Sequence, residues 1–149
     1  MLAREAIRKT IAHYTRIVDN ARYDELREIF LPDATIAVHS GRELRGHEEI
    51  ITAFRAGAEA RGALMPGNFQ RHNVTTAIID LVDSERAIGI QYVMVITELG
   101  FDHCGMYQDE FCRSGNSWLI HHRSARMEWV RPDSRFATWL GAADPARSF

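Results

Sequence analysis

The sequence predicts an α+β domain in which a curved antiparallel sheet wraps around three N-terminal helices to form a cone. Apolar residues recur at helical spacing near the N-terminus, and the pattern changes to long strands after residue 69. A long sheet covered by helices on one side twists around them and leaves a concave interior. We expect a single domain over residues 1–149, with a mainly helical half (1–66), an antiparallel meander (69–130) and a C-terminal tail (131–149).

The first helix is predicted over residues 3–18. Its apolar stripe consists of Ala3, Ile7, Ile11, Tyr14 and Val18, with Ala6 and Ile17 beside it. At about 100° per residue these side chains share one face. A second, short helix is expected from Arg22 to Phe30, and Leu31-Pro32-Asp33 should end it because proline cannot continue the hydrogen-bond ladder.

A short strand over residues 35–39 and a turn at Gly41 should lead to a third helix from His47 to Ala60. Four long strands are expected after the loop that spans Gly62 to Asn68. They cover residues 70–82, 86–97, 105–113 and 117–130, with turns at Asp83-Ser84-Glu85 and Ser114-Gly115-Asn116. The open end of the resulting cone is a natural pocket for a small molecule.

Composition narrows the classes of function. The content of 46% hydrophobic and 26% charged residues is ordinary for a globular protein, and the net charge of −2 argues against nucleic acid as the main partner. No apolar run approaches membrane-spanning length, and the N-terminus lacks the apolar core of a signal peptide. Cys104 and Cys112 show no CxxC spacing, so we expect a cytoplasmic protein with free thiols.

Residues spread over positions 3–130 carry a resemblance to a known family. They are Ile7, Tyr14, Asp19, Tyr23, Leu26, Phe30 to Ala34, Gly46, Ile50, Phe54, Arg71 to Asn73, Gly105, Tyr107, Glu110, Phe111, Gly115, Trp118, Ile120 and Arg123. This pattern resembles the SnoaL-like branch of the nuclear transport factor 2-like superfamily, which implies a cystatin-like α+β barrel. Within that branch it is most similar to scytalone dehydratase, bile-acid 7α-dehydratase and hexachlorocyclohexane dehydrochlorinase.

The resemblance implies a set of catalytic residues. Asp19 and His72 stand where these enzymes pair a helix-end aspartate with a histidine that opens the first long strand. Tyr14 matches a tyrosine of the bile-acid enzyme, and Arg123 matches an arginine of the dehydrochlorinase. His103 lies near a second histidine of scytalone dehydratase, in a register uncertain by one residue, and one residue inverts the face of a strand.

A carboxylate bonded to one imidazole nitrogen fixes the tautomer and makes the other nitrogen a better base. The carboxylate of Asp19 at a helix C-terminus also needs a compensating partner, because the helix dipole is negative there. Helical periodicity, however, directs Asp19 about 100° away from the apolar stripe. A turn that merely ends the helix therefore stays open for Asp19, as do a backbone-bonded strand histidine for His72, core packing for Tyr14 and a structural salt bridge for Arg123.

Large apolar residues are expected to form the pocket wall, which would suit a small apolar, ring-containing ligand. They are Phe54, Met65, Val74, Val93 and Val95, together with Tyr107. Adjacent histidines on a strand point to opposite faces, and the sequence has no HxH or HxxxH pattern, so no metal is expected. Phosphate-loop, dinucleotide and GxSxG motifs are also missing from the sequence, and no cofactor is expected.

The function expected from these residues is a cofactor-independent lyase of the dehydratase type, in which His72 removes a carbon-bound proton. A double-bond isomerase begins with the same step and stays open. The rivals are an inert small-molecule binding protein and an assembly protein resembling the small subunit of ring-hydroxylating dioxygenases. The resemblance also implies a homo-oligomer, a trimer or a dimer, in which a sheet face carrying Trp118, Trp129 and Trp139 could pack between subunits.

Overall fold

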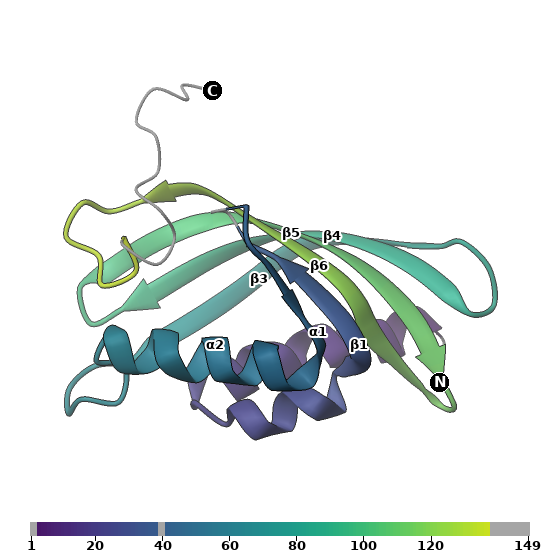
Figure 1. The fold of residues 1–149 in the computed structure, drawn as a ribbon. Helices are drawn as coiled ribbons and strands as arrows, with labels where there is room; N and C mark the ends of the chain where they lie inside the picture. Colours follow the sequence, from purple (N-terminus) through teal and green to yellow (C-terminus); the bar gives the residue numbers. More distant parts are fainter. Residues whose placement is uncertain (1–2, 39–40, 138–149) are drawn as a thin grey trace.

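The fold is a long curved sheet with all its helices on one face (Figure 1). The computed structural model describes residues 3–38 and 41–137. In these ranges the elements, in chain order, are α1 (Ala3–Asp19), the 3-10 helix η1 (Tyr23–Glu28), β1 (Phe30–Ala37), β2 (Glu43–Arg45), α2 (Gly46–Ala60), β3 (Gln70–Leu81), β4 (Arg86–Thr97), β5 (Gly100–Ser114) and β6 (Ser117–Val130). The predicted α+β cone is therefore confirmed. None of the described helices is long and apolar enough to cross a membrane.

The sheet has the strand order β2-β1-β6-β5-β4-β3 and is mixed. The meander β3 to β6 is antiparallel throughout, as predicted. β1, however, joins β6 in parallel, with Ile36 opposite Arg123. Local sequence pattern does not predict this pair, because the paired residues Thr35 and His122 are 87 positions apart in the chain.

The second helix and the strand after it differ from the prediction. The expected helix Arg22 to Phe30 is a 3-10 helix that ends at Glu28, and β1 already begins at Phe30 and runs through Pro32. The register between β1 and β6 shifts between Phe30 and Thr35, so no ladder hydrogen bond is required of Pro32. Two further strand segments were missed, β2 and the first five residues of β5.

The core lies between the helices and the concave face of the sheet. α1 buries its predicted stripe, including Ile7 and Ile11, against β3 and β6, and α2 buries Ile50, Ile51 and Phe54. The Thr10 hydroxyl donates to the carbonyl of Trp118 at 2.6 Å and ties α1 to β6. These contacts fix the helices over one half of the sheet.

β3 is an edge strand with an irregularity in its middle. Its pairing with β4 shifts between Thr75 and Ile78, and Thr76 has a φ of +52°. A β-branched residue with positive φ is a genuine outlier. β3 has one more residue than β4 between these two pairs. This bulge shifts the alternation of side chains, so that Ile78 points outward and Ile79 points into the core.

Candidate active site

Asp19 and His72 are joined by a short hydrogen bond. Asp19 is the last residue of α1 and His72 is the third residue of β3. The Nδ1 atom of His72 lies 2.6 Å from Oδ1 of Asp19, and the His72 main-chain N–H also donates to both carboxylate oxygens at 3.1–3.2 Å. The side chains are only 10% and 9% exposed. With Nδ1 donating to the carboxylate, Nε2 carries the lone pair that a base needs.

This geometry resolves the alternatives left open for Asp19 and His72. Asp19 does end α1, but its carboxylate is turned toward β3 and accepts donors from His72. These donors supply the compensation that a carboxylate needs at the negative end of a helix dipole. The resemblance, rather than helical periodicity, predicted this pairing correctly as a contact; its catalytic role stays a prediction.

His72 lies on the wall of a narrow cavity inside the cone. Its lining residues are Tyr14, Val18, Tyr23, Ile36, Val38, Phe54, Arg61, Gln70, His72, His103, Tyr107, Arg123, Ala125, Met127 and Phe136. The space open to the centres of water molecules is about 60 Å³, enough for several waters. The lining combines apolar and aromatic walls with a few convergent polar groups, as ligand sites usually do.

Arg123 is a fully buried cation on the wall of this cavity. Its Nε and Nη2 atoms donate to the two oxygens of Asp109 at 2.7 and 2.8 Å, and both side chains are almost completely buried. Gln91 donates a further hydrogen bond to the same carboxylate. The third guanidinium nitrogen, Nη1, is buried and has no hydrogen-bond partner among the described residues. The guanidinium also lies close enough to the Tyr14 hydroxyl to lower the pKa of that phenol.

Tyr14 and Tyr107 stack on this cation. The guanidinium carbon of Arg123 lies 4.1 Å from the Tyr14 ring centre and 4.3 Å from that of Tyr107. Burial raises the pKa of Tyr14 and raises the pKa of Tyr107 well above 10, although Arg123 opposes the shift in both. Both phenols are therefore protonated at neutral pH and can act as donors.

His103 forms a second histidine–aspartate pair on the cavity wall. Its Nδ1 lies 2.7 Å from Oδ2 of Asp102, which also accepts the Ser134 hydroxyl at 2.6 Å. Burial lowers the pKa of His103 to about 4, and its bond to Asp102 opposes this only in part. The structure thus settles the register that the sequence left open. His103 faces the cavity as a neutral imidazole, 4.7 Å from the ring of Phe136.

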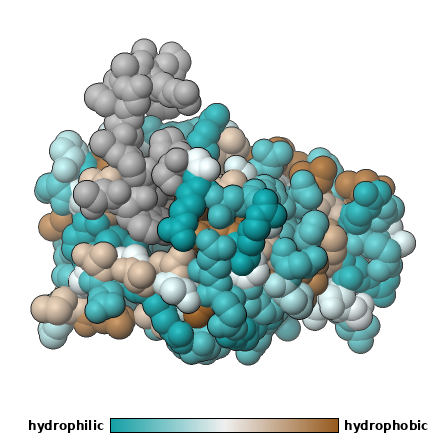
Figure 2. Space-filling model, viewed as in Figure 1, coloured by the Kyte–Doolittle hydropathy of each residue, from teal (hydrophilic) through white to brown (hydrophobic). Residues whose placement is uncertain are grey.

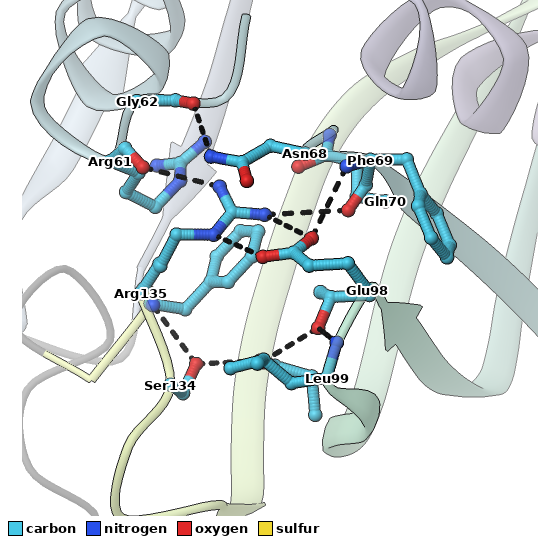
Figure 3. Close-up of polar contacts among 12 residues, drawn as sticks. Arg61, Gly62, Asn68, Phe69, Gln70, Glu98, Leu99, Ser134 and Arg135 are labelled. Carbon is cyan, nitrogen blue, oxygen red and sulfur yellow. Dashed lines mark hydrogen bonds and ion pairs between the residues drawn. The ribbon is translucent and has the colours of Figure 1, made fainter. Parts of the chain in front are cut away.

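The segment after β6 closes over this part of the cavity. Arg135 donates to both carboxylate oxygens of Glu98 at 2.9 and 2.8 Å and to the carbonyl of Arg61 at 3.1 Å, as Figure 3 shows. These bonds join the segment to the β4–β5 turn and to the end of α2. They hold the neighbouring Phe136, which is buried, against His103 and Arg61.

The structure places some predicted pocket residues elsewhere. Phe54 and Tyr107 line the cavity. Met65 does not, because it lies in the loop after α2 with 61% of its area exposed. Val93 and Val95 are wholly buried in the core behind the cavity wall, and Val74 faces a groove between α1 and β3. Strand alternation predicted that these valines are buried, but it could not predict whether they line the cavity or lie deeper in the core.

The predicted tryptophan surface is also corrected in part. Trp118 is buried in the core rather than on an outer face. Trp129 is exposed and stacks on Phe101 with ring centres 5.3 Å apart. Trp139 lies outside the described residues. Among the described residues, Trp129 is thus the one tryptophan of the predicted set that lies on an exposed face.

Several residues of the site were missed by the sequence analysis. They are Gln91, Asp102, Asp109, Arg61 and Phe136. The pairing of Asp109 with Arg123 could not be predicted, because it depends on the register between β5 and β6. The hairpin turn pairs Ser114 with Ser117, but a register shift between Glu110 and Phe111 moves Asp109 opposite Arg123 instead of opposite His122. In the described ranges, no group of three or more His, Cys, Asp or Glu side chains is arranged to hold a metal ion.

The described elements define the class of molecule: an α+β cone of helices over a curved sheet, with a cavity between them. The chain matches the SnoaL-like domain over residues 1–124, and it belongs to that family. A comparison with curated protein sequences finds no match.

Solved structures with the same fold include proteins of several kinds. A protein from Novosphingobium aromaticivorans assigned as a scytalone dehydratase is 17% identical, with a TM-score of 0.72 and 85% of each chain covered. A hexachlorocyclohexane dehydrochlorinase is 17% identical, with a TM-score of 0.70 and 86% of each chain covered. A protein from N. aromaticivorans assigned as the β subunit of an aromatic-ring-hydroxylating dioxygenase is 18% identical, with a TM-score of 0.68, and the match covers 85% of this chain and 90% of that one. At these identities the likeness shows the fold alone.

Proposed function

We propose that this protein is a cofactor-independent lyase of the dehydratase type that acts on a small, apolar, ring-containing substrate in the cytoplasm. One observation carries the proposal. The imidazole of His72, held at 2.6 Å by the buried carboxylate of Asp19, lies on the wall of a cavity that also contains the phenols of Tyr14 and Tyr107 and the guanidinium of Arg123.

In the proposed reaction, Nε2 of His72 removes a proton from the carbon next to a carbonyl group. The carbonyl oxygen becomes an enolate oxygen, and Tyr14 and Arg123 donate hydrogen bonds to the charge that develops there. The electron pair then forms a carbon–carbon double bond as the β-hydroxyl group leaves. The proton held by His72 passes to that group, so water departs and His72 returns to its neutral form.

The buried surroundings favour this chemistry in two ways. Apolar walls exclude water and strengthen the interaction between the imidazolium of His72 and the carboxylate of Asp19. Asp109 neutralises Arg123 and, with Gln91, fixes its orientation, so that Nη1 and the Tyr14 hydroxyl are positioned before the charge appears. Asp109 and Gln91 are thus positioning residues in this proposal.

The test is turnover of a cyclic β-hydroxy ketone, followed by the absorbance of the enone product. We expect the His72→Ala substitution to lower kcat by about 10²- to 10⁴-fold, the usual contribution of a general base. His121→Ala is the matched control, because His121 is an exposed histidine on β6. Equal rates for the wild-type and His72→Ala proteins would remove His72 from the mechanism.

Exchange of the α-proton with D2O, followed by NMR, separates the related functions. A double-bond isomerase would exchange this proton and return a shifted double bond without loss of water. The third candidate is a non-catalytic accessory protein, suggested by the structural similarity to a dioxygenase β subunit. Such a protein would bind the ketone without exchanging its α-proton.

A further inference from the structure

Gln70 is a buried polar residue at the start of β3, and it lies on the wall of the cavity. It is only 7% exposed and precedes His72 by two positions, so that both residues face the cavity. The outer surface seen in Figure 2 is mainly hydrophilic, whereas the cavity is lined largely by apolar and aromatic side chains. A buried amide in such a lining needs hydrogen-bond partners for both its nitrogen and its oxygen.

The amide of Gln70 is only half satisfied. Its Nε2 atom donates to the main-chain carbonyl of Val18 at 2.8 Å. Because a carbonyl oxygen only accepts hydrogen bonds, this contact fixes which end of the amide carries the nitrogen and turns Oε1 away from the Val18 carbonyl. Oε1 is buried and has no hydrogen-bond partner among the described residues. Gln70 therefore keeps an acceptor that a ligand in the cavity can satisfy.

His72 presents an acceptor in the same way. The last two residues of α1 anchor both side chains, since Val18 accepts from Gln70 and Asp19 accepts from His72. Each anchor uses one nitrogen of the side chain, Nε2 in Gln70 and Nδ1 in His72. Each anchor also leaves one acceptor, Oε1 in Gln70 and Nε2 in His72. The wall formed by the start of β3 therefore carries two acceptors, two positions apart on one strand.

The direction of α1 relative to β3 sets the order of the polar groups in the cavity. At one end of this helix–strand pair Val18 is bonded to Gln70, and at the other end Nε of Arg4 donates to the carbonyl of Ile79 at 3.0 Å. The two elements thus run in opposite directions. A residue that comes earlier in α1 lies beside a residue that comes later in β3.

The hydrogen-bond donors follow the acceptors in this order. Tyr14 precedes the end of α1 by more than one helical turn, so it lies beyond His72 as seen from Gln70. The ring centre of Tyr14 is 6.5 Å from that of His72 and 4.1 Å from the guanidinium carbon of Arg123. The groups therefore succeed one another as an acceptor, a base and a pair of donors.

We propose that Gln70 is a specificity-determining residue whose Oε1 accepts a hydrogen bond from the β-hydroxyl group of the substrate. The inference rests on the proposed function, because a β-hydroxy ketone presents its hydroxyl, its α-proton and its carbonyl oxygen in the order of Gln70, His72 and the donors Tyr14 and Arg123. With its proton bonded to Gln70, the hydroxyl oxygen can turn a lone pair toward Nε2 of His72. That nitrogen returns the proton as the carbon–oxygen bond breaks and water leaves.

Calorimetry on the His72→Ala protein tests this contact alone, because this variant lacks the base that would consume the ligand. β-Hydroxycyclohexanone should bind about ten- to a hundredfold more tightly than cyclohexanone, which leaves Oε1 of Gln70 unsatisfied. Adding Gln70→Leu should abolish this preference. Adding Gln108→Leu should preserve it, because Gln108 is an exposed glutamine on β5. Equal affinities for the two ketones in the His72→Ala protein would overturn the proposal.

Kinetics separates this contact from a merely structural role of Gln70. Gln70→Leu should lower kcat/KM for dehydration of β-hydroxycyclohexanone by about ten- to a hundredfold. Exchange of the α-proton of cyclohexanone with D2O involves no leaving group, so the same variant should retain the wild-type exchange rate. A fall of both rates by the same factor would mean that Gln70 only supports the fold around His72, and the proposal would be wrong.

The two measurements also separate this inference from the proposed function. If the wild-type protein neither dehydrates β-hydroxycyclohexanone nor exchanges the α-proton of cyclohexanone, the proposed lyase activity fails. The calorimetric preference then decides by itself whether Gln70 recognises a hydroxyl group.

Discussion

The carboxylate of Asp19 holds His72 at two points, the ring nitrogen Nδ1 and the main-chain N–H. This double contact fixes both the position of the first residues of β3 and the orientation of the imidazole. A single side chain at the end of α1 therefore joins the helical layer to the sheet and sets the protonation pattern of the proposed base.

Asp19→Asn is expected to reduce turnover by about 10²- to 10⁴-fold, because a neutral amide cannot stabilise the imidazolium and allows the wrong tautomer. Stability should change much less, since the amide oxygen can still accept the His72 main-chain N–H. Asp24→Asn is the control, because Asp24 forms an exposed ion pair with Arg55. Turnover and urea denaturation are measured for both variants, and a fully active Asp19→Asn protein would contradict the dyad.

Asp109→Asn is expected to destabilise the fold by about 3–5 kcal/mol, because it leaves the buried charge of Arg123 without its counter-ion. Asp83→Asn should change stability much less, since the Asp83–Arg86 pair is solvent-exposed. Equilibrium urea unfolding measures both. Similar values for the two substitutions would show that the Arg123–Asp109 pair is solvated.

His103 makes stability depend on pH. Burial lowers its pKa from about 6.5 to about 4, so between these values the unfolded chain binds a proton that the folded chain does not. The free energy of unfolding should therefore fall as pH falls from about 6.5 to about 4, by up to about 3 kcal/mol. His103→Asn, which keeps a donor for Asp102, should flatten this dependence, whereas His121→Asn should not. An unchanged slope in His103→Asn would assign the dependence to other groups.

Gly105→Ala should be strongly destabilising. A Cβ at this position would overlap the carbonyl oxygen of Arg126 and lie 2.8 Å from Cα of Met127, so the backbone of β6 would have to move. We expect a loss of about 2–3 kcal/mol, in the upper range for overpacking. Gly41→Ala meets no atom within 4 Å and carries only the cost of a positive φ, about 1–2 kcal/mol. Thermal melts compare the stability of the two variants. A smaller loss of stability for Gly105→Ala than for Gly41→Ala would show that β5 and β6 separate easily at this point.

The sequence predicted the parts of the fold that depend on local pattern. The stripe on α1, the third helix and both hairpins of the meander follow from periodicity and turn residues, and β6 was bounded correctly at Ser117 and Val130. The parallel pairing of β1 with β6 depends on contacts between distant segments, which periodicity does not encode. Pro32 misled the prediction because a register shift frees it from the ladder.

The site was predictable only in part for the same reason. Resemblance located Asp19, His72, Tyr14, Arg123 and His103. The structure brings four of them to the cavity wall, and Asp19 reaches the site through its hydrogen bond to His72. Asp109 could not be placed because a single shift in the β5–β6 register decides which residue opposes Arg123. Phe136 could not be placed because its position depends on the hydrogen bonds of Arg135, not on a strand or helix pattern.

The unusual backbone at Thr76 also affects how this sheet terminates. An edge strand offers unsatisfied N–H and C=O groups to any passing chain, and a long straight edge invites uncontrolled addition of further strands. The distortion at Thr76 interrupts that template halfway along β3, and the opposite edge, β2, is only three residues long. Both borders of the sheet are thus poor starting points for fibril growth.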